Sequence, residues 1–299
     1  MEDLLFTGSS GFLGKNIYPL LLKNYNIATC GTSCQNQIQV NLAKEEPLIK
    51  KHFSIVLHAG GKAHIIPKNE VEEQAFFDVN YIGTRNLCTA LERSGIPESF
   101  IFISTVAVYG CESGKLITED HPLNGDTPYA KSKIMAEEYL QEWCSKFGVK
   151  LGIIRPSLIA GPNPPGNLGA MIRGIDTGRY LSIGEGKARK SVLMVQDIAN
   201  LVPKLEKKGG IYNVCDDYNP SFRELETLIA SQLGKKQPAS IPYFLAKGMA
   251  LVGDYLGRNV PINSLKLKKI TESLTFSNEK AKKELSWQPL SVLECFKIK

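Results

Sequence analysis

Cysteine is sparse and unpatterned in this sequence. The seven cysteines are odd in number and irregularly spaced, and no Cys-x-x-Cys pair occurs. This pattern argues against a disulfide framework and against a zinc site, so we expect no bound metal. It also favours a reducing compartment, and we expect a cytoplasmic protein.

Long apolar runs are also missing. The longest candidate for membrane contact, residues 241–256, is interrupted by Pro242, Lys247, Gly248, Gly253 and Asp254. The segment is therefore too broken for a membrane span, and we expect no stable membrane insertion. A helix packed in a smaller lobe is the expected structure, with a position on the surface as the alternative. The apolar strand close to Met1 predicts that no signal peptide precedes it.

The net charge is also small. The chain has 36 basic and 30 acidic residues, a formal net charge of +6. Because the basic residues are spread out, we interpret clusters such as Lys266–Lys269 as solvated faces and expect no nucleic-acid partner. The hydrophobic fraction of 43% is typical of a soluble protein with a sizeable core.

The first half of the chain alternates short β-rich segments with helical stretches. The expected strands are 4–7, 27–30, 54–58, 100–105, 151–155 and 211–215, and the expected helices are 14–24, 74–94 and 129–147. This alternation predicts an α/β fold with a doubly wound parallel sheet. We assign 1–156 and 188–217 to that domain, and 157–187 and 218–299 to a smaller lobe. The active site should lie between them, beyond the carboxyl ends of the strands.

A glycine-rich loop follows the first expected strand and opens a helix, as in Rossmann-type dinucleotide-binding domains. Gly8 permits the tight turn, Gly11 lets the backbone approach a pyrophosphate, and Gly14 lets the helix pack closely. The amides at the helix N-terminus would then face the phosphates. The loop residues that we predict to bind the cofactor are Gly8, Ser10, Gly11, Phe12, Leu13 and Gly14.

The ribose end of the predicted cofactor site does not distinguish NAD from NADP. An acidic residue about 20 positions beyond the loop marks NAD, and a nearby arginine marks NADP. Here the second strand leads to Thr32 and Ser33, with neither signal. Their hydroxyls could bind a 2′-hydroxyl or a 2′-phosphate, so both cofactors stay open.

Tyr129 precedes Lys133 by four residues in an expected helix, which puts both side chains on one face. An unperturbed tyrosine has a pKa near ~10. A neighbouring ammonium favours the phenolate and is expected to lower that pKa. The pair could exchange a proton with a substrate hydroxyl while a nicotinamide carries hydride, so the sequence predicts a redox enzyme.

In combination these motifs resemble the extended short-chain dehydrogenases/reductases of the nucleotide-sugar epimerase/dehydratase family. The matching segments are the glycine loop, 56–60, 80–87, 104–110, 128–133, 155–156, 161–162, 189–191, 197–199 and 286–289. The resemblance covers nearly the whole chain. It implies a Rossmann-type domain that binds NAD or NADP and a smaller C-terminal lobe that binds a UDP-sugar. By analogy alone, it also implies a homodimer through a helix pair.

The resemblance implies a role for individual residues. Tyr129 is the acid/base, Lys133 binds the nicotinamide ribose and lowers the pKa of Tyr129, and Thr105 bonds the reacting sugar oxygen. A strand-end hydroxyl bonded to backbone is the alternative for Thr105, and Tyr109 lines the pocket or packs as an aromatic. Further implied cofactor-binding residues are Asn41, Leu42, His58, Ala59, Gly60 and Asn80, and further implied substrate-binding residues are Ala107, Asn167, Arg189 and Lys190.

The chain departs from the family pattern at two places, one in the cofactor site and one next to the catalytic threonine. Asn41 stands where relatives have an aspartate that contacts adenine, so that contact is altered. The 4,6-dehydratases have Asp-Glu directly after the catalytic threonine, whereas this chain has Val106 and Ala107, which cannot transfer protons. Dehydration is therefore disfavoured. Segments 155–167 and 189–191 resemble bacterial surface-polysaccharide enzymes, and this resemblance implies 4-epimerisation or 4-keto reduction of a UDP-hexose. A hydroxysteroid-type dehydrogenase and a non-catalytic NAD(P)-sensing protein are the alternatives.

Overall fold

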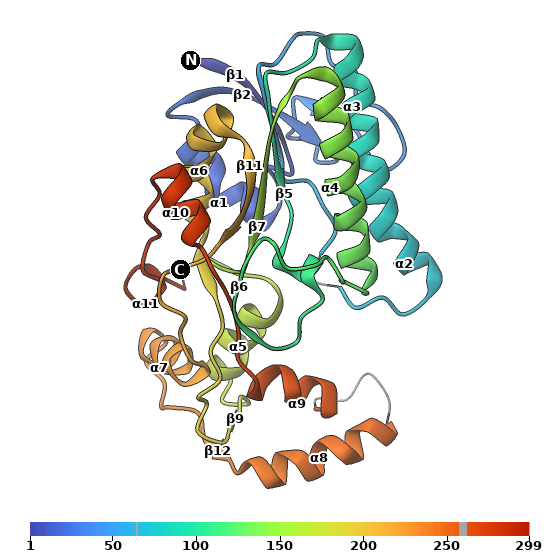
Figure 1. Ribbon diagram of the computed structural model, residues 1–299. Helices are drawn as coiled ribbons and strands as arrows, with labels where there is room; N and C mark the ends of the chain where they lie inside the picture. Colours follow the sequence, from blue (N-terminus) through green and yellow to red (C-terminus); the bar gives the residue numbers. More distant parts are fainter. Residues whose placement is uncertain (64, 257–261, 299) are drawn as a thin grey trace.

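The computed structural model describes residues 1–63, 65–256 and 262–298 (Figure 1). Its centre is a parallel sheet of seven strands in the order β11-β7-β5-β4-β1-β2-β3. These strands are β1 (Glu2–Thr7), β2 (Tyr25–Gly31), β3 (Ile38–Gln39), β4 (Ile55–His58), β5 (Ser99–Ile103), β7 (Lys150–Pro156) and β11 (Gly210–Val214). The strand order reverses at β1, which confirms the expected doubly wound, Rossmann-type α/β fold.

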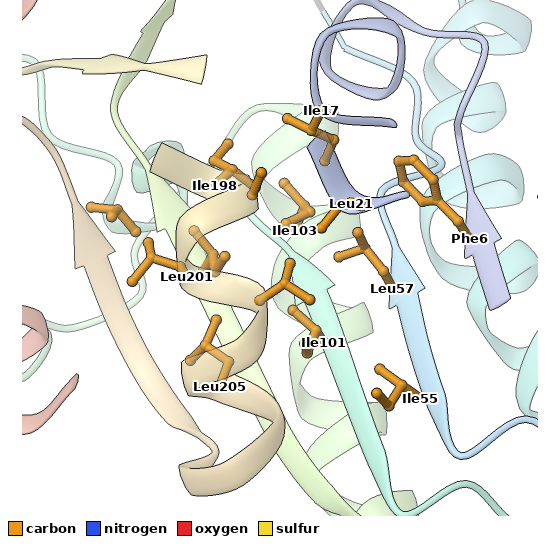
Figure 2. Close-up of a cluster of buried hydrophobic side chains, with 14 of the residues drawn as sticks. Phe6, Ile17, Leu21, Ile55, Leu57, Ile101, Ile103, Ile198, Leu201 and Leu205 are labelled. Atoms are coloured by element: carbon orange, nitrogen blue, oxygen red, sulfur yellow. The ribbon is translucent and has the colours of Figure 1, made fainter. Parts of the chain in front are cut away.

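Helices cover both faces of this sheet (Figure 1). One face carries α1 (Phe12–Leu21), α6 (Val195–Lys208) and α10 (Glu279–Leu285), and the other carries α2 (Glu70–Phe77), α3 (Gly83–Ser94) and α4 (Pro128–Phe147). Successive strand residues point to opposite faces. Leu4, Phe6 and Leu57 therefore pack towards α1 and α6 (Figure 2), whereas Leu5 and Val56 pack towards α3 and α4. Burial on both faces explains the continuous apolar runs of the strands.

The segment predicted as one helix over 74–94 consists of two helices joined by a π-helical turn, η1 (Asp78–Ile82). The backbone is helical without a break from Glu70 to Ser94, so the expected helix is confirmed, and the π turn inserts an extra residue that shifts the helical register within it. This turn holds Asn80 fully buried. The Asn80 amide accepts a bond from the Lys62 backbone N–H at 2.8 Å and donates to the Ser132 hydroxyl at 2.9 Å.

The remaining elements lie mainly at the lower end of the molecule in Figure 1. They are η2 (Val106–Tyr109), β6 (Gly114–Ile117), β8 (Leu158–Ala160), α5 (Gly166–Asp176), β9 (Ser182–Ile183), β10 (Val192–Met194), α7 (Phe222–Gln232), β12 (Ser240–Ile241), α8 (Tyr243–Leu256), α9 (Ser264–Thr271), β13 (Leu274–Phe276) and α11 (Val292–Cys295). Three two-stranded sheets form here, β8 with β10, β9 with β12, and β6 with β13. A separate core that includes Leu168, Ile229 and Phe296 unites α5, α7 and α11.

Some of these contacts cross the predicted division between the domain and the lobe. Strand β10 pairs with β8, and Ala281 and Leu285 of α10 belong to the core under the central sheet. The division itself stays a prediction. Within the described residues, every helix is too short or too polar to cross a bilayer.

Candidate active site

Helix α4 carries both Tyr129 and Lys133, and the local sequence fixes where it begins. The Thr127 hydroxyl accepts a hydrogen bond from the Ala130 backbone N–H at 3.2 Å, and Pro128 occupies the first helical position. A capping hydroxyl followed by a proline favours a helix start at this point. Tyr129 consequently lies in the first turn, with Lys133 one turn further along.

Thr105 lies two residues beyond the end of β5 and caps the short helix η2. Its hydroxyl oxygen accepts a bond from the Ala107 backbone N–H at 3.1 Å. The same hydroxyl lies near the Tyr129 phenol and acts to lower its pKa. The structure thus places Thr105 beside Tyr129. The backbone bond expected of a strand-end hydroxyl is also present, so it does not exclude a position next to the phenol.

The electrostatic environment of Tyr129 differs from the sequence-based expectation. Burial raises the pKa of Tyr129, and the nearby Thr105 hydroxyl opposes this effect. Lys133 does not supply the expected lowering, because its Nζ donates to the Ile103 carbonyl at 2.8 Å and lies 4.4 Å from the centre of the Phe102 ring. The prediction of a lowered tyrosine pKa is therefore wrong for this structure. The protonated phenol is the form that can donate a proton.

Lys133 is itself nearly buried, with 4% of its surface exposed. Burial lowers the pKa of Lys133 to about 8, and the Glu137 carboxylate opposes the shift. A Cβ placed on Gly61 would lie 3.3 Å from the lysine Nζ, so the loop after β4 runs beside this ammonium. This arrangement puts the cation at the edge of the sheet where the glycine loop also lies.

His58, at the end of β4, is bonded to the side chains of neighbouring elements. Its Nε2 lies 3.0 Å from the Thr84 hydroxyl, and its Nδ1 lies beside the Thr7 hydroxyl. Burial, with a smaller contribution from Lys133, lowers the pKa of His58 to about 3. The imidazole is therefore neutral near pH 7 and joins β1, β4 and α3. Its predicted cofactor role stays a prediction.

The glycine loop has the shape that a dinucleotide needs. Gly8 has a φ of +80°, and a Cβ there would lie 2.6 Å from backbone atoms of Ala59 and Gly60. A Cβ on Gly14 would lie 2.2 Å from the Gly8 carbonyl oxygen. At Gly11 the corresponding distance is 3.4 Å, an ordinary contact, which leaves the backbone open to a ligand. The loop and the start of α1 therefore fit a pyrophosphate.

The other predicted loop residues divide by burial. Phe12 and Leu13 are half-buried and pack on the core beneath α1, whereas the Ser10 side chain is exposed. Phe12 and Leu13 would accordingly contribute their backbone N–H groups to phosphate binding, since their side chains face the protein.

The change Gly8→Ala is expected to weaken nicotinamide-cofactor binding at least about tenfold, because the loop must move away from Ala59. Gly148→Ala is the matched control: Gly148 also has a positive φ, +70°, but a Cβ there meets nothing within 4 Å. Fluorescence titration with NADH and NADPH, together with the Tm of both variants, measures the difference. Equal cofactor affinity in the two variants would contradict the assigned loop geometry.

The ribose side of the predicted site contains a residue that the sequence did not reveal, Asn36. The Ser9 hydroxyl donates to the Asn36 side-chain oxygen at 2.9 Å, and the Asn36 amide donates to the Ser33 carbonyl at 3.1 Å. Asn36 thus joins the glycine loop to the loop that contains Thr32 and Ser33. Its neutral side chain favours neither NAD nor NADP. No periodic pattern marks Asn36, so sequence analysis had no signal for it.

Asn41 and Leu42 follow β3, at the predicted adenine end. The Asn41 side-chain oxygen accepts a bond from the Ala43 backbone N–H at 3.1 Å. The Leu42 carbonyl accepts from the Asn86 side chain at 2.7 Å, which ties this loop to α3. These contacts hold the loop in place, and direct contact with adenine stays a prediction.

The predicted diphosphate ligands are Asn167, in the segment assigned to the smaller lobe, and Arg189 and Lys190, in the segment assigned to the dinucleotide-binding domain. Asn167 is exposed in the first turn of α5. The Arg189 guanidinium donates to the Asn219 carbonyl at 2.7 Å, and Lys190 is half-buried, which lowers its pKa. No described contact joins these three residues to Tyr129. Their substrate roles, and that of Ala107, stay predictions.

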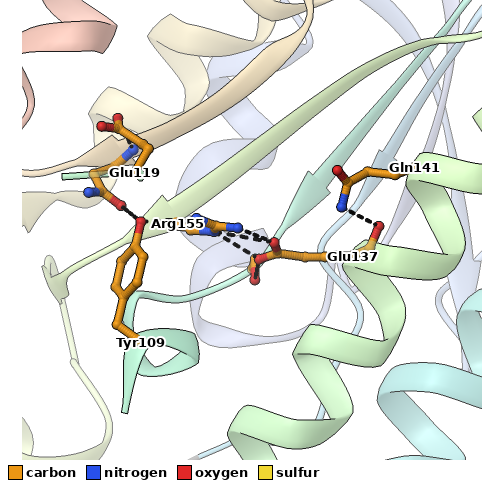
Figure 3. A network of polar contacts seen from close by, with 7 residues as sticks. Tyr109, Glu119, Glu137, Gln141 and Arg155 are labelled. Carbon is orange, nitrogen blue, oxygen red and sulfur yellow. Dashed lines mark hydrogen bonds and ion pairs between the residues drawn. The ribbon is translucent and has the colours of Figure 1, made fainter. Parts of the chain in front are cut away.

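A buried polar network joins α4, β7 and η2 (Figure 3). The Arg155 guanidinium donates to the Glu137 carboxylate at 2.6 Å and to the Tyr109 hydroxyl at 3.0 Å. Ser104, the neighbour of Thr105, donates to the same carboxylate, and Tyr109 donates to Asn213 at 2.6 Å. Tyr109 is therefore a packed aromatic, and Arg155 is structural. Glu137 escaped sequence analysis, although its spacing of four residues from Lys133 was a usable signal.

A model of the NAD dependent epimerase/dehydratase family matches residues 4–215. The chain is 28% identical, over 93% of its length and 88% of the relative, to N-acetyl-alpha-D-glucosaminyl-diphospho-ditrans,octacis-undecaprenol 4-epimerase of Escherichia coli O157:H7. It is 26% identical to UDP-glucose 4-epimerase of Vibrio cholerae, over 98% and 92% of the two chains.

A solved structure of RMD from Pseudomonas aeruginosa complexed with NADPH has the same fold. Its TM-score is 0.75 at 22% identity, over 98% of this chain and 95% of that one. The family match spans the glycine loop, Thr105, Tyr129 and Lys133. The chain therefore belongs to the NAD dependent epimerase/dehydratase family of extended short-chain dehydrogenases/reductases, as its motifs predicted.

Proposed function

We propose that this enzyme moves hydride at C4 of a UDP-hexose, by 4-epimerisation or 4-keto reduction, with Tyr129 as acid/base. The observation that carries the proposal is the contact between Thr105 and Tyr129 at the start of α4, with Lys133 one turn further. The names of the relatives support chemistry at C4 of a diphosphate-linked sugar.

Each of these side chains has a distinct task in the proposed reaction. A bound nicotinamide supplies or accepts the hydride. Tyr129 carries its proton near pH 7, as an ordinary phenol does, and donates it to the C4 oxygen during reduction. Thr105 would hold that oxygen and steady its developing charge. Lys133 would bind a ribose hydroxyl through the ammonium that now donates to the Ile103 carbonyl.

Loss of water from the sugar is disfavoured at this site. Val106 and Ala107, the first residues of η2, follow Thr105 directly. Their side chains have no group that can move a proton to or from C5 or C6. The reaction that fits the residues is therefore a change at C4 alone.

The carrier of the sugar is a separate question. UDP is the carrier named for the Vibrio relative, and undecaprenol diphosphate is the carrier named for the Escherichia relative. A sugar on a lipid diphosphate is the second candidate substrate. One observation favours it: large apolar side chains of α8 in the smaller lobe are exposed.

A substrate panel tests this proposal. The purified chain is incubated with NAD or NADP and UDP-glucose, UDP-N-acetylglucosamine or undecaprenyl-diphospho-N-acetylglucosamine, and with reduced cofactor and 4-keto sugars. Epimerisation is expected to invert C4 without net change in nicotinamide absorbance, whereas reduction consumes one reduced cofactor per product. Turnover of a hydroxysteroid, with no sugar accepted, would overturn the proposal.

A further inference from the structure

Helix α8 packs through small residues and presents its large apolar residues to solvent. Ala246, Ala250 and Gly253 are the buried residues of this helix, and the two alanines share a core with Leu267 of α9. The exposed large residues of α8 are Tyr243, Phe244, Leu245, Met249, Leu251, Val252 and Tyr255. The expected helix is therefore present and packs on α9 through its small residues, whereas its large apolar side chains are exposed.

The exposed residues form one continuous stripe, which we call the α8 stripe. Phe244, Leu251 and Tyr255 share the side opposite the buried alanines, and their exposed fractions are 70%, 53% and 93%. Leu245 and Val252 widen the stripe along one margin. Figure 1 shows α8 along the outer edge of the molecule, remote from the central sheet. An exposed apolar surface of this kind marks contact with another molecule or a membrane.

The sequence segment that contains the stripe is basic. Residues 235–271 include seven of the 36 basic residues of the chain but one acidic residue, Asp254. The rest of the chain then has equal numbers of both, so this segment accounts for the whole net charge. Lys247 adjoins Phe244 and Leu251 by helical spacing, and both Lys247 and Lys268 of α9 are exposed. Two lysines of the segment are paired with carboxylates.

We propose that the α8 stripe docks on an anionic lipid bilayer, with α8 lying in the plane of the interface. A helix with an apolar face and flanking lysines has the pattern of interfacial helices, which lie on a membrane without spanning it. Lysines next to the stripe would be attracted to anionic headgroups. A second copy of this chain is a poorer occupant, because a two-fold axis would bring two basic segments together.

Docking would bring the smaller lobe to the membrane surface. A sugar on a lipid diphosphate would be presented there, and this consequence alone rests on the proposed function. The docking itself depends on the stripe and its lysines, and vesicle binding measures it without any turnover.

Co-sedimentation of the full chain with vesicles tests the proposal. Wild type is expected to bind phosphatidylcholine vesicles that contain phosphatidylglycerol, and to bind pure phosphatidylcholine more weakly. Phe244→Glu and Leu251→Glu should each lower the affinity about tenfold or more, since they remove buried apolar area. Lys268→Gln should lower it about fivefold. Leu48→Glu is the matched control, because Leu48 is a 74% exposed leucine outside the smaller lobe, and it should bind like wild type.

Two results would overturn the docking proposal. One is equal sedimentation of wild type, Phe244→Glu and Leu251→Glu. The other is a wild-type dimer in light scattering that Phe244→Glu dissociates, together with no vesicle binding. The variant Tyr129→Phe should sediment with vesicles like wild type. A failure of the catalytic assignment is thereby separated from a failure of docking.

Discussion

The change Tyr129→Phe is expected to lower kcat by about 10²–10⁴-fold, the range for loss of a general acid/base. The variant loses the hydroxyl that lies near Thr105 and keeps the aromatic ring. That ring lies 6.2 Å from the ring centre of Phe76, and phenylalanine preserves this packing. We therefore expect unchanged folding and nearly unchanged cofactor affinity. Steady-state turnover of the best substrate of the panel, with a fluorescence titration of NADH and NADPH, separates the two effects.

Tyr139→Phe is the matched control for this change. Tyr139 lies on the same helix, and the centre of its ring lies 6.2 Å from the centre of the Tyr81 ring. Loss of its hydroxyl should leave kcat within about twofold, because it lies outside the site. Comparable turnover in the two variants would refute the acid/base role of Tyr129, and a parallel loss of cofactor binding would assign it a structural role.

The change Glu137→Gln is expected to destabilise the protein by about 3–5 kcal/mol, the cost of breaking a buried ion pair from one side. Glu137 is fully buried and Arg155 is 3% exposed, and the guanidinium would lose its compensating charge. Ser104 would also lose its charged acceptor. Since a protein of this kind has about 5–15 kcal/mol of stability, a large share would be lost. Urea denaturation followed by circular dichroism measures the free energy of unfolding.

Two comparisons make the test specific. The double change Glu137→Met with Arg155→Met removes both charges, so it should cost less than Glu137→Gln alone. Glu185→Gln breaks an exposed ion pair with Lys187 and should leave the free energy of unfolding unchanged. If Glu137→Gln proved as mild as Glu185→Gln, the buried network would not contribute to stability as described.

Local patterns in the sequence predicted the fold and two local features of the candidate site, the glycine loop and the common helical face of Tyr129 and Lys133. Apolar strands that alternate with helical stretches predicted the doubly wound sheet, because parallel strands are buried on both faces. Gly8, Gly11 and Gly14 predicted the dinucleotide loop, and the spacing of Tyr129 and Lys133 placed them on one helical face. These features depend on neighbours within a few residues, which a single sequence displays directly.

Local patterns of this kind could not predict contacts between segments that are distant in the sequence. The π turn at Asn80 is held by Lys62 and Ser132, and Asn36 meets Ser9 across the sheet edge. The pKa of Tyr129 was predicted with the wrong sign because burial raises it and because the Lys133 ammonium bonds the Ile103 carbonyl of β5.

The sequence by itself determined which chemical groups the protein has and on which elements they lie. Only the tertiary structure decided which groups meet, as with Glu137 and Arg155, and which stay exposed, as with Phe244 and Tyr255 of α8. The physical reason is that burial and pairing depend on the surfaces that helices and strands offer one another. The α8 segment reads as apolar in sequence, yet its packing uses the small residues and leaves the large ones outside.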